Sequence, residues 1–280
     1  MTIPGDAHTI ASILHSAPVP QLEARILIGH VTRLSRIQLI TQSEQALRDE
    51  EIAQIRILFE RRRHGEPIAY LTGEREFYGL SLKVTPAVLI PRPETELLVE
   101  LAIQNLPPQG RLLDMGTGSG AIALAVAHQR PDAHITALDV SAEALQIAQS
   151  NADRHQLKVQ FIRSDWFAAL DPALTDNARY DVIVSNPPYI VAGDPHLAQG
   201  DLRFEPTDAL TDHGDGLSAL RILSKQAGHY LSPQGHLLME HGYDQAQAVR
   251  ALLMADGFDE VQSWRDLAGI ERVSGGKKRA

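Results

Sequence analysis

Asp114-Met115-Gly116-Thr117-Gly118-Ser119-Gly120 is the stretch of the sequence that indicates the fold. A short apolar run, residues 111–115, leads into it, and a helical pattern, residues 121–128, follows it. Glycines here let the backbone turn sharply and let a ligand approach its N–H groups closely. Asp139 ends the next apolar run, where a carboxylate can accept hydrogen bonds from both hydroxyls of a ribose. The loop and Asp139 together predict a nucleotide-type binding site.

The residues around this loop alternate between strand and helix patterns. Apolar runs typical of strands lie at residues 111–115, 134–138, 159–162, 180–185 and 235–240. Helical patterns follow at residues 121–128, after Ser141, and near 217–230 and 243–255. Such alternation predicts an α/β fold whose sheet is largely parallel, with helices on both faces. Residues 257–263 and 270–273 predict two more strands that close the sheet antiparallel, and the tail 275–280 is expected to fray.

The N-terminal part has a different pattern. Apolar residues recur at helical spacing, first at Leu22, Ile26 and Leu27 and then at residues 52, 55, 58 and 59. Arg61-Arg62-Arg63-His64-Gly65 is typical of a helix end, with basic residues in the last turn and glycine beyond it. Aromatic and aliphatic residues between 68 and 84 predict a hairpin. The expected organisation is a helical domain at 1–66, a hairpin linker at 67–90 and a second domain at 91–280.

Composition narrows the class of protein. The chain has 280 residues, 44% of them hydrophobic, a net charge of −9 and no cysteine, which excludes disulfides and thiolate metal sites. No apolar run is long enough to span a bilayer, and residues 1–8 lack the pattern of a signal peptide, so we expect a cytoplasmic protein. The acidic balance opposes stable nucleic-acid binding, which needs clustered Lys and Arg.

Asp114 narrows the identity of the nucleotide-type ligand that the loop is expected to bind. Residues 118–123 also satisfy the G-x-G-x-x-A pattern of dinucleotide binding, so a nicotinamide dehydrogenase is the alternative. A carboxylate just before the glycines is unfavourable beside a pyrophosphate but suits a ligand with an ammonium group, such as S-adenosylmethionine. The loop resembles the first motif of class I methyltransferases, which implies a Rossmann-like, seven-stranded, mostly parallel sheet. In that pattern Asp165 and Trp166 hold the adenine ring.

Asn186-Pro187-Pro188-Tyr189 follows the predicted strand that ends at Ser185. Parallel sheets bind ligands at the carboxyl ends of their strands, so this tetrapeptide is expected to face the ligand. The side-chain oxygen of Asn186 and the main-chain oxygen of Pro187 can accept both N–H bonds of a planar amide or amine. Tyr189 can place its ring against that group, and alignment of the nucleophile requires no strong base. The tetrapeptide resembles the fourth motif of amino-methyltransferases, which act on adenine, on guanine or on glutamine side chains.

The whole chain resembles the peptide-chain release factor glutamine methyltransferase family. The segments that carry this resemblance are residues 61–73, 76–77, 90–96, 114–120, 164–167, 184–190, 203–206, 240–242 and 271–273. The resemblance implies that S-adenosylmethionine methylates the side-chain amide of the glutamine in the Gly-Gly-Gln motif of a release factor. A nucleic-acid amino-methyltransferase and a non-catalytic adenosyl-ligand binding module are the alternatives.

The resemblance also implies roles for individual residues. The catalytic residues are Asn186, Pro187 and Tyr189, and the substrate contacts are Asn186, Pro187, Pro188 and Tyr189. The cofactor contacts are Gly116, Thr117, Gly118, Ser119, Gly120, Asp139, Trp166 and Asn186.

The helical domain is expected to recognise the body of the release factor, and the loop 191–216 is expected to cover the substrate site. No metal is expected, because His196 and His213 lack ligand-like spacing.

Overall fold

The computed structural model describes residues 8–171, 173 and 178–279. Residues 1–7, on which the expectation about a signal peptide partly depends, lie outside this description. The chain divides into two compact units, and the boundary falls between Gly73 and Glu74. In the part of the chain that is described, no helix is long and apolar enough to cross a membrane.

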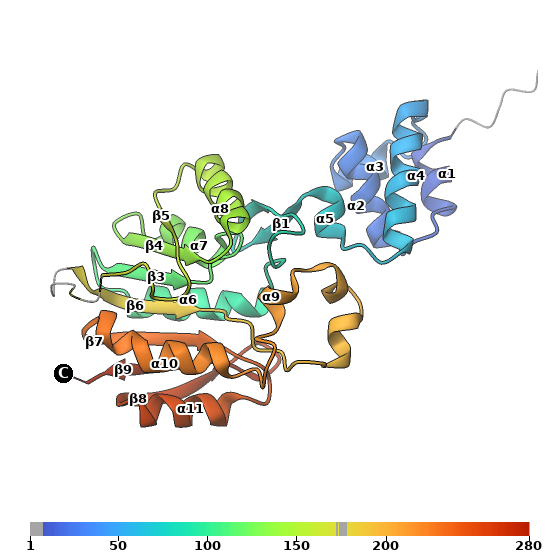
Figure 1. The fold of residues 1–280 in the computed structure, drawn as a ribbon. Coiled ribbons are helices and arrows are strands. Elements are labelled where there is room, and N and C mark those ends of the chain that lie inside the picture. The colour runs from blue at the N-terminus through green and yellow to red at the C-terminus, as the bar shows by residue number, and fades with distance from the viewer. Residues whose placement is uncertain (1–7, 172, 174–177, 280) are drawn as a thin grey trace, which may run out of the picture. The chain divides into compact units, whose positions relative to one another are not determined.

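The first unit is a small helical bundle. It contains α1 (Ile10–His15), α2 (Gln21–Thr32), α3 (Arg36–Thr41), α4 (Asp49–Arg63) and α5 (Ile68–Thr72) (Figure 1). The apolar residues of α4 are buried as predicted, at positions 52, 55, 58 and 59. Helix α2 also forms where helical spacing predicted it, with Ala24, Leu27 and Ile28 buried and with Leu22 and Ile26 exposed. Both sides of α2 are apolar, and helical spacing alone does not say which side meets the core.

The arginines at the end of α4 form ion pairs with glutamates of the same unit. Arg62 donates to Glu23 on α2 through Nε and Nη2, at 2.7 and 2.8 Å. Arg61 pairs with Glu66, and Arg63 pairs with Glu60 in its own helix. These contacts fit the interpretation of the cluster as a helix end rather than as a phosphate-binding patch.

The hairpin is shorter than predicted. Its strands are β1 (Glu74–Phe77) and β2 (Leu80–Lys83), paired antiparallel, whereas residues 68–72, predicted as part of it, form helix α5. The three consecutive residues Ala69, Tyr70 and Leu71 are all buried in α5. A short run that is buried on all sides has no periodicity by which a strand could be told from a helix.

The second unit contains the predicted seven-stranded sheet. Its strands are β3 (Arg111–Met115), β4 (His134–Asp139), β5 (Gln160–Arg163), β6 (Tyr180–Ser185), β7 (Leu231–Glu240), β8 (Phe258–Arg265) and β9 (Glu271–Lys278). They are arranged in the order β5-β4-β3-β6-β7-β9-β8 (Figure 1). The first five in this order are parallel, and β9 runs antiparallel to both β7 and β8. The order reverses between β3 and β6, which is where open parallel sheets bind ligands.

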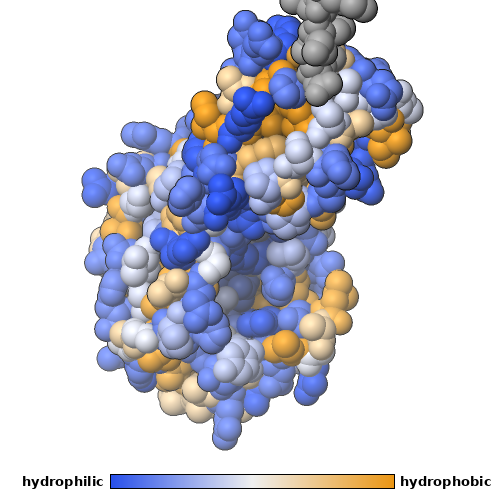
Figure 2. Space-filling view, turned by 90° about the vertical axis from the view of Figure 1, so that its right-hand side faces the viewer, coloured by the Kyte–Doolittle hydropathy of each residue, from blue (hydrophilic) through white to orange (hydrophobic). Residues whose placement is uncertain are grey.

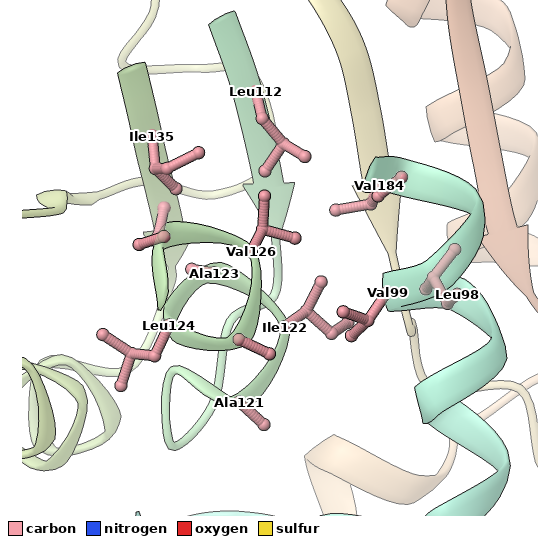
Figure 3. Close-up of a cluster of buried hydrophobic side chains, with 14 of the residues drawn as sticks. Leu98, Val99, Leu112, Ala121, Ile122, Ala123, Leu124, Val126, Ile135 and Val184 are labelled. Atoms are coloured by element: carbon pink, nitrogen blue, oxygen red, sulfur yellow. The ribbon is translucent and has the colours of Figure 1, made fainter. Parts of the chain in front are cut away.

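Helices cover both faces of this sheet. Helices α6 (Glu96–Asn105), α7 (Ala121–Gln129) and α8 (Ala142–His155) pack on one face, and α10 (Ser218–Tyr230) and α11 (Ala246–Ala255) pack on the other. Consecutive strand residues therefore enter different cores. Leu112 joins the α6 and α7 side and Leu113 joins the α10 side. Figure 3 shows Val99 and Ile122 between α6 and α7, with Leu112, Ile135 and Val184 above them on the strands.

The C-terminal tail belongs to the sheet, so the prediction that it frays is wrong for residues 275–278. Gly275 pairs with Leu238 on one side and with Gln262 on the other. A Cβ atom at Gly275 would lie 2.6 Å from the main-chain oxygen of Leu237. The glycine thus permits close packing of the strand, although glycine and charge together suggested a loose end.

Candidate active site

The carboxyl ends of β3, β4 and β6 surround a cavity of about 380 Å³. It lies where the strand order reverses, as expected for a ligand site in this kind of sheet. Figure 2, which views the right-hand side of Figure 1, shows this face of the second unit as hollowed. Of the residues predicted from the sequence, those that line the cavity are Gly116, Gly118, Asp139, Asp165, Trp166, Asn186 and Pro188.

The glycine loop contributes its backbone to this cavity. Gly116 and Gly118 have φ angles of +75° and +57°, and a Cβ atom built on either would meet open space. Substitution there would strain the backbone in the left-handed region and fill room that a ligand needs. Thr117, Ser119 and Gly120 belong to the same turn but do not line the cavity. Both hydroxyl-bearing side chains are buried.

Asp139 is half-buried at the end of β4 and is held by the backbone on both sides. Its Oδ2 accepts a hydrogen bond from the Gly118 N–H at 2.9 Å, and its Oδ1 accepts from the Ser141 N–H at 2.9 Å. Burial raises the pKa of Asp139 above its ordinary value, and these backbone hydrogen bonds oppose the rise. Each carboxylate oxygen can accept more than one hydrogen bond, so the group can still receive two hydroxyls from the cavity.

Asp114 lies beneath the loop rather than in the cavity. Its Oδ2 accepts hydrogen bonds from the Thr117 hydroxyl at 2.6 Å and from the Ala123 N–H at 3.2 Å. The side chain is fully buried, and this burial raises the pKa of Asp114 to about 7. The structure thus gives Asp114 a role in holding the turn, and it is not among the residues that line the cavity. A ligand in the cavity therefore makes no direct contact with the Asp114 carboxylate, contrary to the expectation that this charge would face an ammonium group.

Ser164, Asp165 and Trp166 follow β5 and form the side of the cavity away from the tetrapeptide. The hydroxyl of Ser164 donates to the main-chain oxygen of Trp166 at 2.6 Å and so fixes the turn. Trp166 has a φ of +46° and lines the cavity, whereas Phe167 is buried and stacks on Tyr230 with ring centroids 4.7 Å apart. The two neighbouring aromatic residues therefore have different positions, one at the cavity and one in the core.

Asn186 is half-buried at the end of β6 and keeps one side of its amide available. Its Nδ2 donates a hydrogen bond to Thr95 Oγ1 at 3.2 Å. No described residue donates to its Oδ1, which is therefore the atom suited to accept from a ligand. Pro188 lines the cavity beside it, whereas Pro187 is buried and does not.

Tyr189 extends away from the cavity toward Glu240, at the end of β7. Its hydroxyl donates to Glu240 Oε1 at 3.4 Å. Glu240 is 1% exposed, and burial raises its pKa to about 7. Burial, with the nearby charge of Glu240, raises the pKa of Tyr189 too, so this tyrosine is neutral. Sequence reasoning assigned no role to Thr95 or Glu240, although both lie in the segments that carried the family resemblance.

The loop 191–216 lies partly over the cavity. Three of its residues, Pro206, Asp208 and Ala209, are among the lining residues. Pro206 lies between η4 (Leu202–Phe204) and α9 (Thr207–Leu210), and the other two lie in α9. Glu205, whose side chain is fully buried, accepts a hydrogen bond from Arg92 Nη2 at 2.6 Å. This ion pair attaches the loop to the segment that precedes η1 (Pro93–Thr95).

The two histidines of this loop pair with aspartates at the surface. His196 contacts Asp194, and His213 contacts Asp208, each at 2.7 Å. Among the described residues, no group of three or more His, Cys, Asp or Glu could hold a metal ion.

Residues 86–89 also line the cavity and were missed by sequence reasoning. They connect β2 to η1, and Val88 is buried. The only signal in the sequence was their position just before Ile90-Pro91-Arg92-Pro93, in a stretch that was interpreted as a linker.

Comparison with known proteins places the chain in a family. Residues 93–265 match the family model of the methyltransferase small domain, and residues 8–73 match that of the PrmC N-terminal domain. The release factor glutamine methyltransferase of Burkholderia pseudomallei is 52% identical over 277 residues, 96% of each chain. That of Bordetella pertussis is 52% identical over 269 residues, 95% of this chain and 98% of the relative.

A solved structure shares the fold at lower identity. A methyltransferase from Pyrococcus furiosus is 20% identical, with a TM-score of 0.55, over 79% of this chain and 98% of that chain. The curated relatives decide the family, because they match at high identity over nearly their whole length. The chain belongs to the release factor glutamine methyltransferase family.

Proposed function

We propose that this protein transfers the methyl group of S-adenosylmethionine to the side-chain amide nitrogen of the glutamine in the Gly-Gly-Gln motif of a peptide-chain release factor. The observation that carries the proposal is the position of Asn186. Its Oδ1 has no donor among the described residues and lies at the strand end next to the glycine loop. One cavity thus combines a nucleotide-type site with an acceptor suited to an amide N–H. The membership of the chain in its family supports this assignment.

The cavity has the features that S-adenosylmethionine requires. Asp139 would accept the ribose hydroxyls, and the backbone of the glycine loop, residues 116–120, would contact the amino-acid portion. Asp165 and Trp166 would hold the adenine, one through its carboxylate and one through its ring face. The open space above Gly116 and Gly118 supports this fit. When bound, the cofactor supplies a methyl group on a sulfonium, which is a good leaving group.

The protein's own residues would act by orientation. An amide nitrogen is a poor nucleophile because its lone pair is delocalised. Asn186 Oδ1 and the main-chain oxygen of Pro187 would accept its two N–H bonds and so fix the direction of the lone pair. Pro188, which lines the cavity, would confine the planar group, and Pro187 and Pro188 stiffen the loop. Alignment of this kind can contribute roughly 7–11 kcal/mol, so no strong base is required.

The first unit would recognise the body of the release factor. Among its described residues, five large apolar ones are exposed, Leu22, Ile26, Ile37, Ile40 and Ile57, and Figure 2 shows apolar patches among the polar surface of this unit. Exposed apolar residues that gather on one small domain are typical of a protein-binding surface. The three arginines at the end of α4 pair with glutamates, and we propose accordingly that the protein does not bind nucleic acid stably. We also propose that it acts in the cytoplasm, where it would meet a release factor.

Mass spectrometry of a release factor incubated with the protein and S-adenosylmethionine tests the proposal. The expected product carries one methyl group on the glutamine of Gly-Gly-Gln. A release factor with Glu in place of that Gln is the matched control and should remain unmodified. A short Gly-Gly-Gln peptide should react more slowly than the intact protein, because it lacks the surface that the first unit would bind. Methylation of RNA or DNA in preference to the release factor would contradict the proposal.

A further inference from the structure

The loop 191–216 contributes one wall of the cavity, and this wall is fixed at both ends. We define the wall as residues 206–210, which are Pro206 and helix α9. Three of its residues line the cavity, Pro206, Asp208 and Ala209. At its C-terminal end, the main-chain oxygen of Leu210 accepts a hydrogen bond from the Ile190 N–H at 2.9 Å. Ile190 directly follows the tetrapeptide, so this end of the wall is bonded to the proposed substrate side of the cavity.

Glu205 fixes the other end of the wall. It directly precedes Pro206, and its side chain is fully buried. Its Oε1 accepts a hydrogen bond from Arg92 Nη2 at 2.6 Å, whereas its Oε2 has no hydrogen-bond partner among the described residues. A buried carboxylate that is only half satisfied depends strongly on the opposite charge that faces it. The place of the wall therefore depends on Arg92.

The turn that carries Arg92 also holds Asn186. Residues 92–95 form one turn, in which the main-chain oxygen of Arg92 accepts from the Thr95 N–H at 3.1 Å. Thr95 Oγ1 accepts from Asn186 Nδ2 at 3.2 Å, while the Arg92 side chain holds Glu205. The turn leads directly into α6, which packs on the sheet. One short segment thus holds both the proposed acceptor for the substrate amide and the wall of the same cavity.

We propose that Arg92 and Glu205 are positioning residues, whose ion pair holds the wall in place relative to Asn186 and so limits where the glutamine amide can lie. This inference rests on the proposed function, since the group that the wall confines is the amide of that reaction. Neither residue lines the cavity, so both act through the wall and not by contact with the substrate or the cofactor.

Single-turnover methylation of a release factor at saturating S-adenosylmethionine tests this role, with Arg92→Met as the first variant. Methionine keeps much of the side-chain length but leaves the buried Glu205 carboxylate without its charge partner. An uncompensated buried charge is costly, so the carboxylate should leave its place and move the wall with it. A misplacement of about 1 Å can cost roughly 100-fold, so the rate should fall about 10- to 100-fold. Calorimetry should show little change in cofactor affinity, because the contacts proposed for the cofactor come from other segments.

The double variant Arg92→Met/Glu205→Leu separates positioning from direct contact. It removes both charges, and apolar replacements of a buried ion pair are often tolerated because no buried charge is left unpaired. The wall should then return to its place, and most of the wild-type rate should be recovered. If Arg92 instead contacted the substrate or the cofactor, the second substitution would not restore the rate.

Trypsin gives a readout of the wall that needs no methylation. Arg203 is exposed, lies two residues before Glu205 and is the only Lys or Arg in the loop 191–216. Cleavage after Arg203, followed by mass spectrometry of the fragments, should be faster in Arg92→Met than in the wild type. In the double variant it should return to the wild-type rate.

Arg221→Met is the matched control. Arg221 pairs with Asp215 of the same loop at 2.6 Å, but both side chains are about half exposed. Exposed ion pairs contribute little, and their loss leaves no buried charge. This variant should therefore keep the wild-type rate of methylation and the wild-type rate of cleavage after Arg203.

Several results would overturn the positioning role. One is an Arg92→Met variant with the rates of Arg221→Met in both assays, and another is a loss confined to cofactor affinity. A third is a double variant that stays as slow as Arg92→Met. If Arg92→Met does not fold, the double variant decides, since a rate near that of the wild type supports the role and a slow one overturns it. A wild-type protein that leaves the release factor unmethylated would contradict the proposed function, whereas the trypsin comparison would still show whether the ion pair holds the wall.

Discussion

The two sides of the cavity are built in different ways. On the proposed cofactor side, the glycine loop contributes its backbone, and Asp139 is fixed by N–H groups of Gly118 and Ser141. On the proposed substrate side, Asn186 and Tyr189 are held through side chains of Thr95 and Glu240, which come from distant parts of the chain. The first side is local in sequence and the second is assembled by the fold.

This difference has a functional consequence. Backbone donors and an anchored carboxylate suit tight recognition of one invariant ligand. A side-chain network can set the orientation of a single amide, but each member depends on the others. We therefore expect substitutions on the cofactor side to change affinity and substitutions on the substrate side to change the rate of the chemical step.

The largest expected effect is that of Asn186→Asp on turnover. A carboxylate near the sulfonium stabilises the charged ground state, and this charge disappears in the transition state, so the rate falls even where binding improves. Single-turnover rates should fall about 100-fold or more. Calorimetry should show S-adenosylmethionine binding that is retained or tighter. Asn186→Ala is the control, with a similar loss of rate and no gain in affinity.

Asp139→Ala should have a smaller effect, on the other side of the cavity. It removes the acceptor for two ribose hydroxyls, and a hydrogen bond to a charged group is worth roughly 1.5–3 kcal/mol. Calorimetric titration with S-adenosylmethionine should show that loss of binding free energy. Undiminished binding would contradict the role of Asp139, and saturable binding of NAD to the wild-type protein would favour a dehydrogenase.

Asp114→Asn should have the smallest effect on turnover, because Asp114 lies beneath the loop. Its effect should appear in stability. Burial raises the pKa of Asp114 to about 7 in the folded state, so the unfolded chain ionises first as pH rises from about 4. Ionisation of the unfolded state alone lowers the free energy of unfolding, so the wild-type protein loses stability between about pH 4 and 7.

The variant carries no titrating group at this position and should gain stability relative to wild type across that range. Urea unfolding at several pH values measures the difference, which we expect to grow by about 4 kcal/mol between pH 4 and 7, because each unit of the rise in the pKa of Asp114 is worth roughly 1.4 kcal/mol. The exposed Asp244→Asn serves as control. A difference that does not change with pH would show that Asp114 is ionised in the folded protein.

The sequence was sufficient to predict that Gly116, Gly118 and Asp139 lie together at the cavity, because the signals that identify them are contiguous. The glycine loop lies between a strand and a helix, and Asp139 ends the next strand, so spacing alone placed both. The tetrapeptide was found for the same reason. Thr95 and Glu240 are single polar residues separated by more than a hundred positions, and only the register of β6 and β7 brings Glu240 beside Asn186.

Other features that the sequence left open or gave wrongly have similar causes. Helix α2 is apolar on two sides, and the choice between Leu22 and Leu27 depends on what packs against it. Gly275 suggested a loose tail, whereas strand β9 needs the absence of a side chain to lie close to Leu237. In each case the local pattern was ambiguous, and tertiary contacts decided the outcome.

The dependence of the single-turnover rate on S-adenosylmethionine concentration tests the separation of the two sides most directly. The comparison is between Asp139→Ala and Asn186→Asp, with an intact release factor as substrate. We predict that Asp139→Ala needs more cofactor but approaches the wild-type rate at saturation, because its defect lies in binding. Asn186→Asp should saturate at or below the wild-type concentration and stay slow at every concentration. A saturating rate for Asn186→Asp equal to that of the wild type would contradict the account, since Asn186 would then not orient the nucleophile.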